Sequence, residues 1–407
     1  MSRRYGAHLC FTPMINSKVF TDPNQRSYQE SVFSTFPQDR PLIGQICGND
    51  PNVVLKAALK LQESCDAIDL NLGCPQAIAK KGHYGSYLQD EWELIGKIVT
   101  TLHENLQIPV TCKIRIFSDV EKTLRYAKML QDSGCQMLTV HGRLREQRGL
   151  NTGLADWNQI KRIKQELNIP IVANGNILYH EDIEKCIEYT GCDGVMTAEG
   201  NLYNPGIFTD ICYPVWQMAS EYLNLCREYS APVSYVRGHL FKLYRNTIMN
   251  YPTLRDRLAF AKKLEEIIEL NEELTKCLKD SYGSEIVEKS MKDFVKDSEG
   301  YYSIPPYYCQ PYFRTLAKNI SNEENENLSK ALCKQDNEQD IINSTENSLS
   351  THAFNISNIP STNAPDNDFE EFPCSLNQTT GKHCCNATFL EESKPKRLVM
   401  ELSVTET

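Results

Sequence analysis

The chain has 407 residues, of which 41% are hydrophobic, and a net charge of −10. No run approaches the roughly 18 consecutive apolar residues of a membrane span, and the N-terminus has no apolar signal region, so we expect a globular intracellular protein. Its 16 cysteines include no C-x-x-C pair, which argues against a zinc ribbon and favours reduced thiols.

The acidic charge is concentrated in the C-terminal part. Residues 1–270 contain equal numbers of basic and acidic side chains, and the whole excess of acidic side chains lies in 271–407. A balanced body does not exclude nucleic-acid binding, because local clusters of lysine and arginine make the phosphate contacts.

Residues 1–210 alternate short β-type runs with helical runs. Helical patterns occur near 50–64, 86–105, 120–133, 156–167 and 181–189. Strands separated by helices predict parallel pairing, and a unit of roughly 30 residues is typical of a TIM (β/α)8-type barrel. A Rossmann-type open sheet is the alternative, but no G-x-G-x-x-G motif follows a strand. The seven predicted strands are 9–12, 42–46, 67–71, 110–115, 137–141, 169–174 and 194–198.

The pattern becomes all-helical after the predicted barrel (1–210). Segments 211–229, 232–250 and 253–280 predict a helical domain at 211–300, with several basic side chains on its exposed faces. Residues 301–318 are an aromatic and proline-rich connector. The polar composition of 319–407 cannot offset the entropy of ordering, so we predict a disordered acidic tail there.

Polar side chains recur at the C-terminal ends of the predicted strands, on the face where barrel enzymes build their sites. Cys74 follows such a strand in the sequence Asn71-Leu72-Gly73-Cys74-Pro75, at the point where a loop begins. It is the candidate catalytic residue; the alternative is a small buried cysteine. The other strand-end residues are Gln45, Lys113, Arg115, His141, Arg143, Asn174, Gly175, Asn176, Ala198 and Glu199.

Six short motifs of this chain resemble those of the dihydrouridine synthases, flavin enzymes that reduce uridine in tRNA. They occur in family order between about residues 8 and 210. The loop 13–17 and the segment 198–205 are most similar to the eukaryotic branch that acts at positions 16 and 17 of the tRNA D-loop. The motifs are Gly44-Gln45-Ile46, Asp69–Pro75, Cys112–Arg115, Thr139–Arg143, Ala173–Ile177 and Ala198–Gly200.

The resemblance implies an FMN-binding enzyme that uses NAD(P)H to reduce the uracil 5,6 double bond of D-loop uridines. The implied partner is tRNA. We also expect a monomer in the cytoplasm and also in the nucleus, with neither a metal nor a membrane contact. Cys74 would be the general acid, because a thiol with a pKa of about 8.5 is mostly protonated at neutral pH.

The implied roles of the other site residues follow the family motifs. Lys113 would stabilise the anionic reduced ring of FMN. Asn71, Arg115 and Arg143 would contact the target uridine or its phosphate. The remaining implied FMN contacts are Gln45 and His141 at the ring, with Asn174, Gly175, Asn176, Ala198 and Glu199 at the phosphate.

The chain departs from the family pattern at its start. Family members begin the barrel with a strand that ends in an Ala-Pro-Met type segment, whereas residues 2–7 correspond to the end of the helix that follows it. We therefore expect the first barrel strand to be missing and the form to be N-terminally shortened. Two alternatives follow: a catalytically impaired tRNA-binding form, and a small-molecule FMN oxidoreductase.

Overall fold

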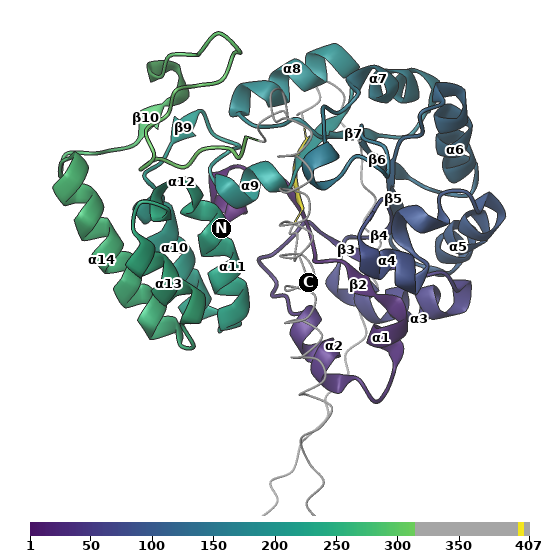
Figure 1. The fold of residues 1–407 in the computed structure, drawn as a ribbon. Helices are drawn as coiled ribbons and strands as arrows, with labels where there is room; N and C mark the ends of the chain where they lie inside the picture. The colour runs from purple at the N-terminus through teal and green to yellow at the C-terminus, as the bar shows by residue number, and fades with distance from the viewer. Residues whose placement is uncertain (314–397, 403–407) are drawn as a thin grey trace, which may run out of the picture. The chain divides into compact units, whose positions relative to one another are not determined.

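The computed structural model describes residues 1–313 and 398–402 (Figure 1). Short 3-10 turns at Ser2–Tyr5, Gln62–Ser64, Gly85–Leu88, Gly149–Asn151 and Met291–Asp293 join the main elements. The strands are β1 (Leu9–Phe11), β2 (Ile15–Asn16), β3 (Leu42–Cys47), β4 (Ala67–Leu72), β5 (Val110–Arg115), β6 (Met137–His141), β7 (Ile171–Asn174), β8 (Gly194–Thr197), β9 (Ile211–Cys212), β10 (Lys289–Ser290) and β11 (Leu398–Leu402).

Helices alternate with the strands of the barrel and then follow one another without interruption by barrel strands (Figure 1). Three barrel helices begin after an aspartate whose carboxylate accepts hydrogen bonds from the first turn: Asp50 before α3, Asp119 before α6 and Asp156 before α7. The helices are α1 (Ser17–Thr21), α2 (Arg26–Val32), α3 (Pro51–Leu61), α4 (Ala77–Gly82), α5 (Trp92–Asn105), α6 (Val120–Asp132), α7 (Trp157–Glu166), α8 (His180–Thr190), α9 (Glu199–Tyr203), α10 (Val215–Glu228), α11 (Val233–Leu243), α12 (Arg245–Ile248), α13 (Pro252–Phe260) and α14 (Leu264–Tyr282).

The strands close into a parallel ring, which confirms the predicted barrel class. From β3 to β8, each strand pairs in parallel with the next one along the chain. β1 pairs with β3 on one side and with β11 on the other, and β11 pairs with β8. All seven predicted strands are present, with ends that shift by at most two residues.

The strand count differs from the prediction at one place in the ring. The predicted ring lacks a strand between β8 and β1, and residues 398–402 fall in the predicted disordered tail. In the structure, these residues form β11, which occupies that position. The run Leu398-Val399-Met400 has the β-prone composition of a buried strand, but the polar composition around it hides this signal. The rest of the predicted tail, 319–397 and 403–407, and the end of the predicted connector, 314–318, lie outside the described residues.

Alternation along the strands divides the side chains between two cores. Outward-facing residues such as Leu70, Ile114 and Val140 join the main cluster with the surrounding helices. Inside the ring, a small apolar cluster that includes Phe11, Ile43 and Met196 fills one end of the barrel. The inward positions that follow along the same strands are polar, so the barrel interior changes from apolar to polar toward the C-terminal ends of its strands.

The helices α10 to α14 form a separate apolar cluster. The predicted single helix 253–280 is wrong, because Ala261 leaves the helical conformation (φ −58°, ψ 131°) and divides the segment into α13 and α14. In α14, the side chains of Ile267, Leu270 and Leu274 are buried. None of the described helices is long and apolar enough to cross a membrane.

Deletion of residues 397–407 tests the part that β11 plays in closing the ring. We expect the melting temperature to fall by about 3 °C or more, because β1 and β8 each lose a strand partner. Deletion of 403–407 alone keeps β11 and serves as the control in thermal unfolding followed by circular dichroism. An unchanged melting temperature after the longer deletion would show that the ring does not depend on β11.

Candidate active site

Cys74 lies two residues after the end of β4, in a turn that the side chain of Asn71 stabilises. The Asn71 Oδ1 atom accepts hydrogen bonds from the backbone N–H groups of Gly73 (3.1 Å) and Cys74 (2.9 Å). The Cys74 thiol is half-buried, and its Sγ lies 3.7 Å from Gln76 Oε1. Burial raises the pKa of this thiol above its usual value, so the sulfur stays protonated at neutral pH.

Gly85 and Ser86 hold the same turn from the other side. Gly85 adopts a φ of +63°, and a Cβ atom there would lie 2.8 Å from the Cys74 carbonyl oxygen and 3.0 Å from its Cβ. The Ser86 N–H and hydroxyl both donate to that carbonyl, at 3.0 and 2.8 Å. A side chain at position 85 would therefore displace Cys74.

A row of buried polar side chains extends from Cys74 into the barrel. The Asn71 amide donates to Gln45 Oε1 (2.9 Å), and the Gln45 amide donates to Asp69 Oδ2 (2.9 Å). The Thr111 hydroxyl donates to the other oxygen of Asp69 (2.7 Å). Burial raises the pKa of Asp69 to about 6.

Lys113 is a buried cation within the ring. Its Nζ donates to Asn174 Oδ1 (3.1 Å), and the Asn174 amide donates in turn to the Met196 carbonyl (3.0 Å). Burial and then Arg115 lower the pKa of Lys113 to about 8, while the charge of Asp69 opposes that shift. The structure thus brings together two of the predicted cofactor-binding residues, Lys113 and Asn174.

His141, Arg143 and Asn176 form a second contact set at the ends of β6 and β7. Arg143 Nη1 lies 3.1 Å from His141 Nε2, and Arg143 Nη2 donates to Asn176 Oδ1 (2.7 Å). Burial and the nearby cations hold the pKa of His141 well below its usual value, so the ring is neutral at neutral pH. An arginine only donates, so the neutral ring accepts at Nε2 and carries its proton on Nδ1.

Gly175 allows the backbone to approach this set closely. Its φ is +112°, and a Cβ atom there would lie 2.7 Å from Ala155 Cβ and 3.1 Å from His141 Cδ2. The last predicted phosphate contacts, Ala198 and Glu199, begin α9 directly after β8. The following residue, Gly200, packs on the backbone after β7, where its Cβ would meet the Ile177 carbonyl at 2.6 Å.

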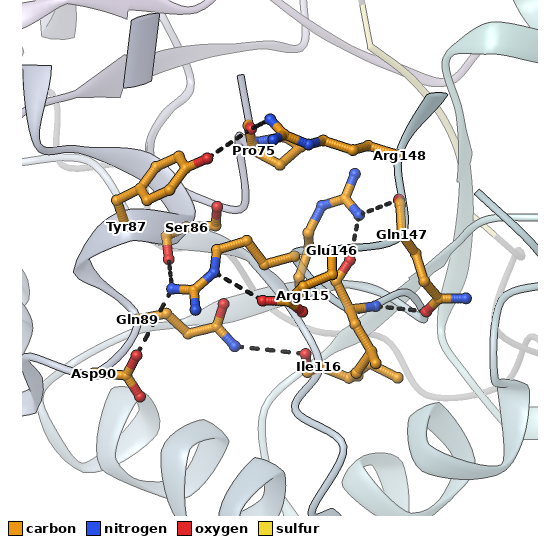
Figure 2. A network of polar contacts seen from close by, with 12 residues as sticks. Pro75, Ser86, Tyr87, Gln89, Asp90, Arg115, Ile116, Glu146, Gln147 and Arg148 are labelled. Atoms are coloured by element: carbon orange, nitrogen blue, oxygen red, sulfur yellow. Dashed lines mark hydrogen bonds and ion pairs between the residues drawn. The ribbon is translucent and has the colours of Figure 1, made fainter. Parts of the chain in front are cut away.

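Three arginines bind carbonyl groups around the Cys74 turn, and Figure 2 shows the contact of Arg148 with Pro75 and that of Arg115 with Gln147. Arg115 Nε donates to the Gly73 carbonyl (2.9 Å), Arg148 Nη1 to the Pro75 carbonyl (2.6 Å) and Arg145 Nη1 to the Ser86 carbonyl (3.3 Å). Arg115 also donates to the carbonyls of Leu144 and Gln147. The predicted substrate residue Arg115 therefore joins the loop 143–148 to the cysteine turn.

The basic side chains of the helical region have partners of several kinds. Arg255 pairs with Asp256 and Arg257 with Glu273, which reduces their net positive charge. The Arg237 guanidinium donates to the Ala261 carbonyl, and that of Arg245 lies 4.0 Å from the centre of the Tyr312 ring. Within the described residues, no three or more His, Cys, Asp and Glu side chains are grouped so that they could hold a metal ion.

Sequence reasoning missed several residues of this site. Asp69 belongs to the motif Asp69–Pro75 but was not predicted to be a site residue. Its position gave a signal, because a residue two positions before Asn71 in a strand faces the same side of the sheet. Gly85, Ser86, Arg145 and Arg148 gave no local signal of their contacts, which join segments distant in sequence.

Comparison with known proteins gives the family. The family model described as dihydrouridine synthase (Dus) matches residues 1–296. A mouse protein named tRNA-dihydrouridine(16/17) synthase NAD(P)(+)-like is 45% identical over 341 residues, covering 83% of this chain and 69% of the relative. Fission-yeast (Schizosaccharomyces pombe) and budding-yeast (Saccharomyces cerevisiae) proteins named tRNA-dihydrouridine(16/17) synthase are 47% and 45% identical, covering 78% of this chain and 84% and 80% of the relatives. The chain therefore belongs to the dihydrouridine synthase family.

Proposed function

We propose that this protein reduces the uracil 5,6 double bond of D-loop uridines in tRNA, with NAD(P)H as the reductant and FMN as the bound cofactor. One observation carries the proposal: the turn that bears the Cys74 thiol is fixed at the end of a barrel strand, near the buried amine of Lys113. The names of the relatives support NAD(P) as the reductant and positions 16 and 17 as the target.

Cys74 is the proposed proton donor. Reduction of the double bond requires a proton at C5 of the uracil, and a thiol whose pKa is raised by burial remains available as an acid at neutral pH. Two sets of contacts hold this acid in place: Asn71 binds the N–H groups of the turn, and Ser86 binds its carbonyl. The turn therefore needs little reorganisation before the proton moves.

The barrel interior suits a flavin. Lys113 is a buried cation whose described hydrogen-bond partner, Asn174, is neutral, so it can stabilise negative charge on a ring. The buried Thr139 hydroxyl stands beside Lys113 in register and has no hydrogen-bond partner among the described residues. A bound FMN would supply the hydride chemistry for C6 of the uracil, with NAD(P)H as the source of the hydride. Gln45, His141 and the set of Asn174, Gly175, Asn176, Ala198 and Glu199 complete the proposed cofactor contacts.

Arg143, together with Arg115, is the proposed contact to the uridine or its phosphate, and Asn71 is a proposed uridine contact. The arginines already donate to carbonyl oxygens, so a phosphate would replace a neutral acceptor with a charged one. The basic side chains of α11 to α13 are proposed to bind the tRNA backbone, with an affinity that falls as salt rises.

Replacement of the proposed acid is the first test. We expect Cys74→Ala to lower dihydrouridine formation by roughly 100-fold or more, because the proton donor is lost, while FMN binding and its reduction by NADPH persist. Liquid chromatography and mass spectrometry of nucleosides from unmodified tRNA measure the product. Cys277→Ala, on α14, is the matched control and should retain wild-type turnover. Wild-type turnover of Cys74→Ala would remove this residue from the acid role.

Replacement of the buried cation is the second test. We expect Lys113→Met to weaken FMN binding by roughly 10- to 100-fold, since a charged hydrogen bond contributes about 1.5–3 kcal/mol. Titration of the purified protein with FMN, followed by flavin fluorescence, gives the dissociation constant. Lys122→Met, on the outside of the barrel where Lys122 pairs with Asp90, is the control. Equal affinities of the two variants would contradict the role of Lys113, and a wild-type chain that binds no FMN would contradict the proposed reaction.

A further inference from the structure

We propose that Asp69 is a positioning residue, whose carboxylate fixes the orientation of the Gln45 and Asn71 side-chain amides and, through them, the position of the Cys74 thiol. This inference deepens the proposed function and rests on it for the role of the thiol. It assigns a role in the site to Asp69, which makes no direct contact with the Cys74 turn.

The location of Asp69 suits an indirect role. It lies in the middle of β4 with 0% of its surface exposed, and both of its carboxylate oxygens have donors. Register pairing places it directly between Gln45 on β3 and Thr111 on β5. A carboxylate that is enclosed in this way acts on the site through its neighbours.

The donor and acceptor order of the hydrogen bonds connects Asp69 to the Cys74 turn. An ionised carboxylate only accepts, so the Gln45 NH2 group must face Asp69, and Gln45 Oε1 must face Asn71. Gln45 Oε1 in turn requires the Asn71 NH2 group, which leaves Asn71 Oδ1 toward the N–H groups of Gly73 and Cys74. Reversal of the Asn71 amide would place its NH2 group against these N–H donors, and reversal of the Gln45 amide would place its NH2 group against that of Asn71. We call this chain of Asp69, Gln45 and Asn71 the amide relay.

The ionisation of Asp69 is compatible with this role. Burial raises the pKa of its carboxyl group to about 6, which is still below neutral pH, and the charge of Lys113 favours the ionised form. The carboxylate is thus an acceptor under the conditions in which the turn must be ordered. Its two hydrogen bonds offset part of the cost of burying a charge.

Thiol reactivity provides a test that needs neither FMN nor tRNA. Asp69→Asn replaces an acceptor-only group with one that can present an NH2 group to Gln45, so the order of the amide relay is no longer fixed. We expect the rate of Cys74 alkylation by iodoacetamide in the purified full chain, measured by peptide mass spectrometry, to rise roughly threefold or more. For an active enzyme, kcat should fall by roughly tenfold while KM changes less than twofold.

A double-mutant cycle distinguishes the amide relay from a general loss of stability. If Asp69 acts through Asn71, the alkylation rate of Asp69→Asn combined with Asn71→Ala will equal that of Asn71→Ala alone. If the two substitutions instead act independently, so that their effects on the alkylation rate multiply in the double variant, the proposal is overturned. Asp66→Asn is the matched control. Asp66 lies just before β4, at the end of that strand opposite to Cys74, and its Oδ2 accepts a hydrogen bond from the Leu42 N–H (2.6 Å). The rate of Cys74 alkylation in Asp66→Asn should equal that in the wild type.

Two further measurements keep the outcome clear. If Asp69→Asn does not fold, Gln45→Met interrupts the amide relay while the Thr111 hydroxyl still donates to Asp69, and its Cys74 alkylation rate should match that of Asn71→Ala; a wild-type rate for Gln45→Met would overturn the proposal. If the wild-type chain fails to reduce uridine but the cycle shows the expected coupling, the amide relay stands and only the proposed function fails.

Discussion

Parallel pairing around a closed ring is the constraint on which every contact of the site depends. Because all strands of the ring run in the same direction, their C-terminal residues meet on one face. Gln45, Asp69 and Thr111 become neighbours through the register of β3, β4 and β5. The same register carries Lys113 next to Asn71 on one side and Thr139 on the other. Without closure of the ring, these polar side chains would not be buried against one another.

Burial of this polar layer is costly, and its internal hydrogen bonds limit that cost. Asp69 and Lys113 carry opposite charges that favour each other, as the causes of their pKa shifts show. The amides of Gln45, Asn71 and Asn174 satisfy one another or a backbone group. A network of this kind fixes one arrangement, because a reversed amide would leave a buried donor facing another donor.

The sequence predicted the parts of this structure that depend on local pattern. Strand alternation placed the polar residues at the strand ends, and the turn Asn71–Pro75 was recognised from its glycine and proline. Contacts that join distant segments were not predictable, because the close approach of Gly85 to Cys74 depends on the path of the loop before α5. The break between α13 and α14 was missed since Ala261 is a good helix former, and tertiary packing outweighs that preference. β11 was missed because composition averaged over a long segment conceals a short apolar run.

The arginine contacts around the cysteine turn have a consequence for how an anion would be received. Arg115 and Arg148 hold the turn through bonds to carbonyl oxygens, which bear no net charge. The guanidinium charge is therefore ordered in space before any anion arrives. An incoming phosphate can take over a donor from a carbonyl, so the number of hydrogen bonds is conserved while an ion pair is gained. Each exchange also frees a carbonyl of the cysteine turn, while Asn71 and Ser86 continue to hold the turn, so that the anion can dock without displacing Cys74.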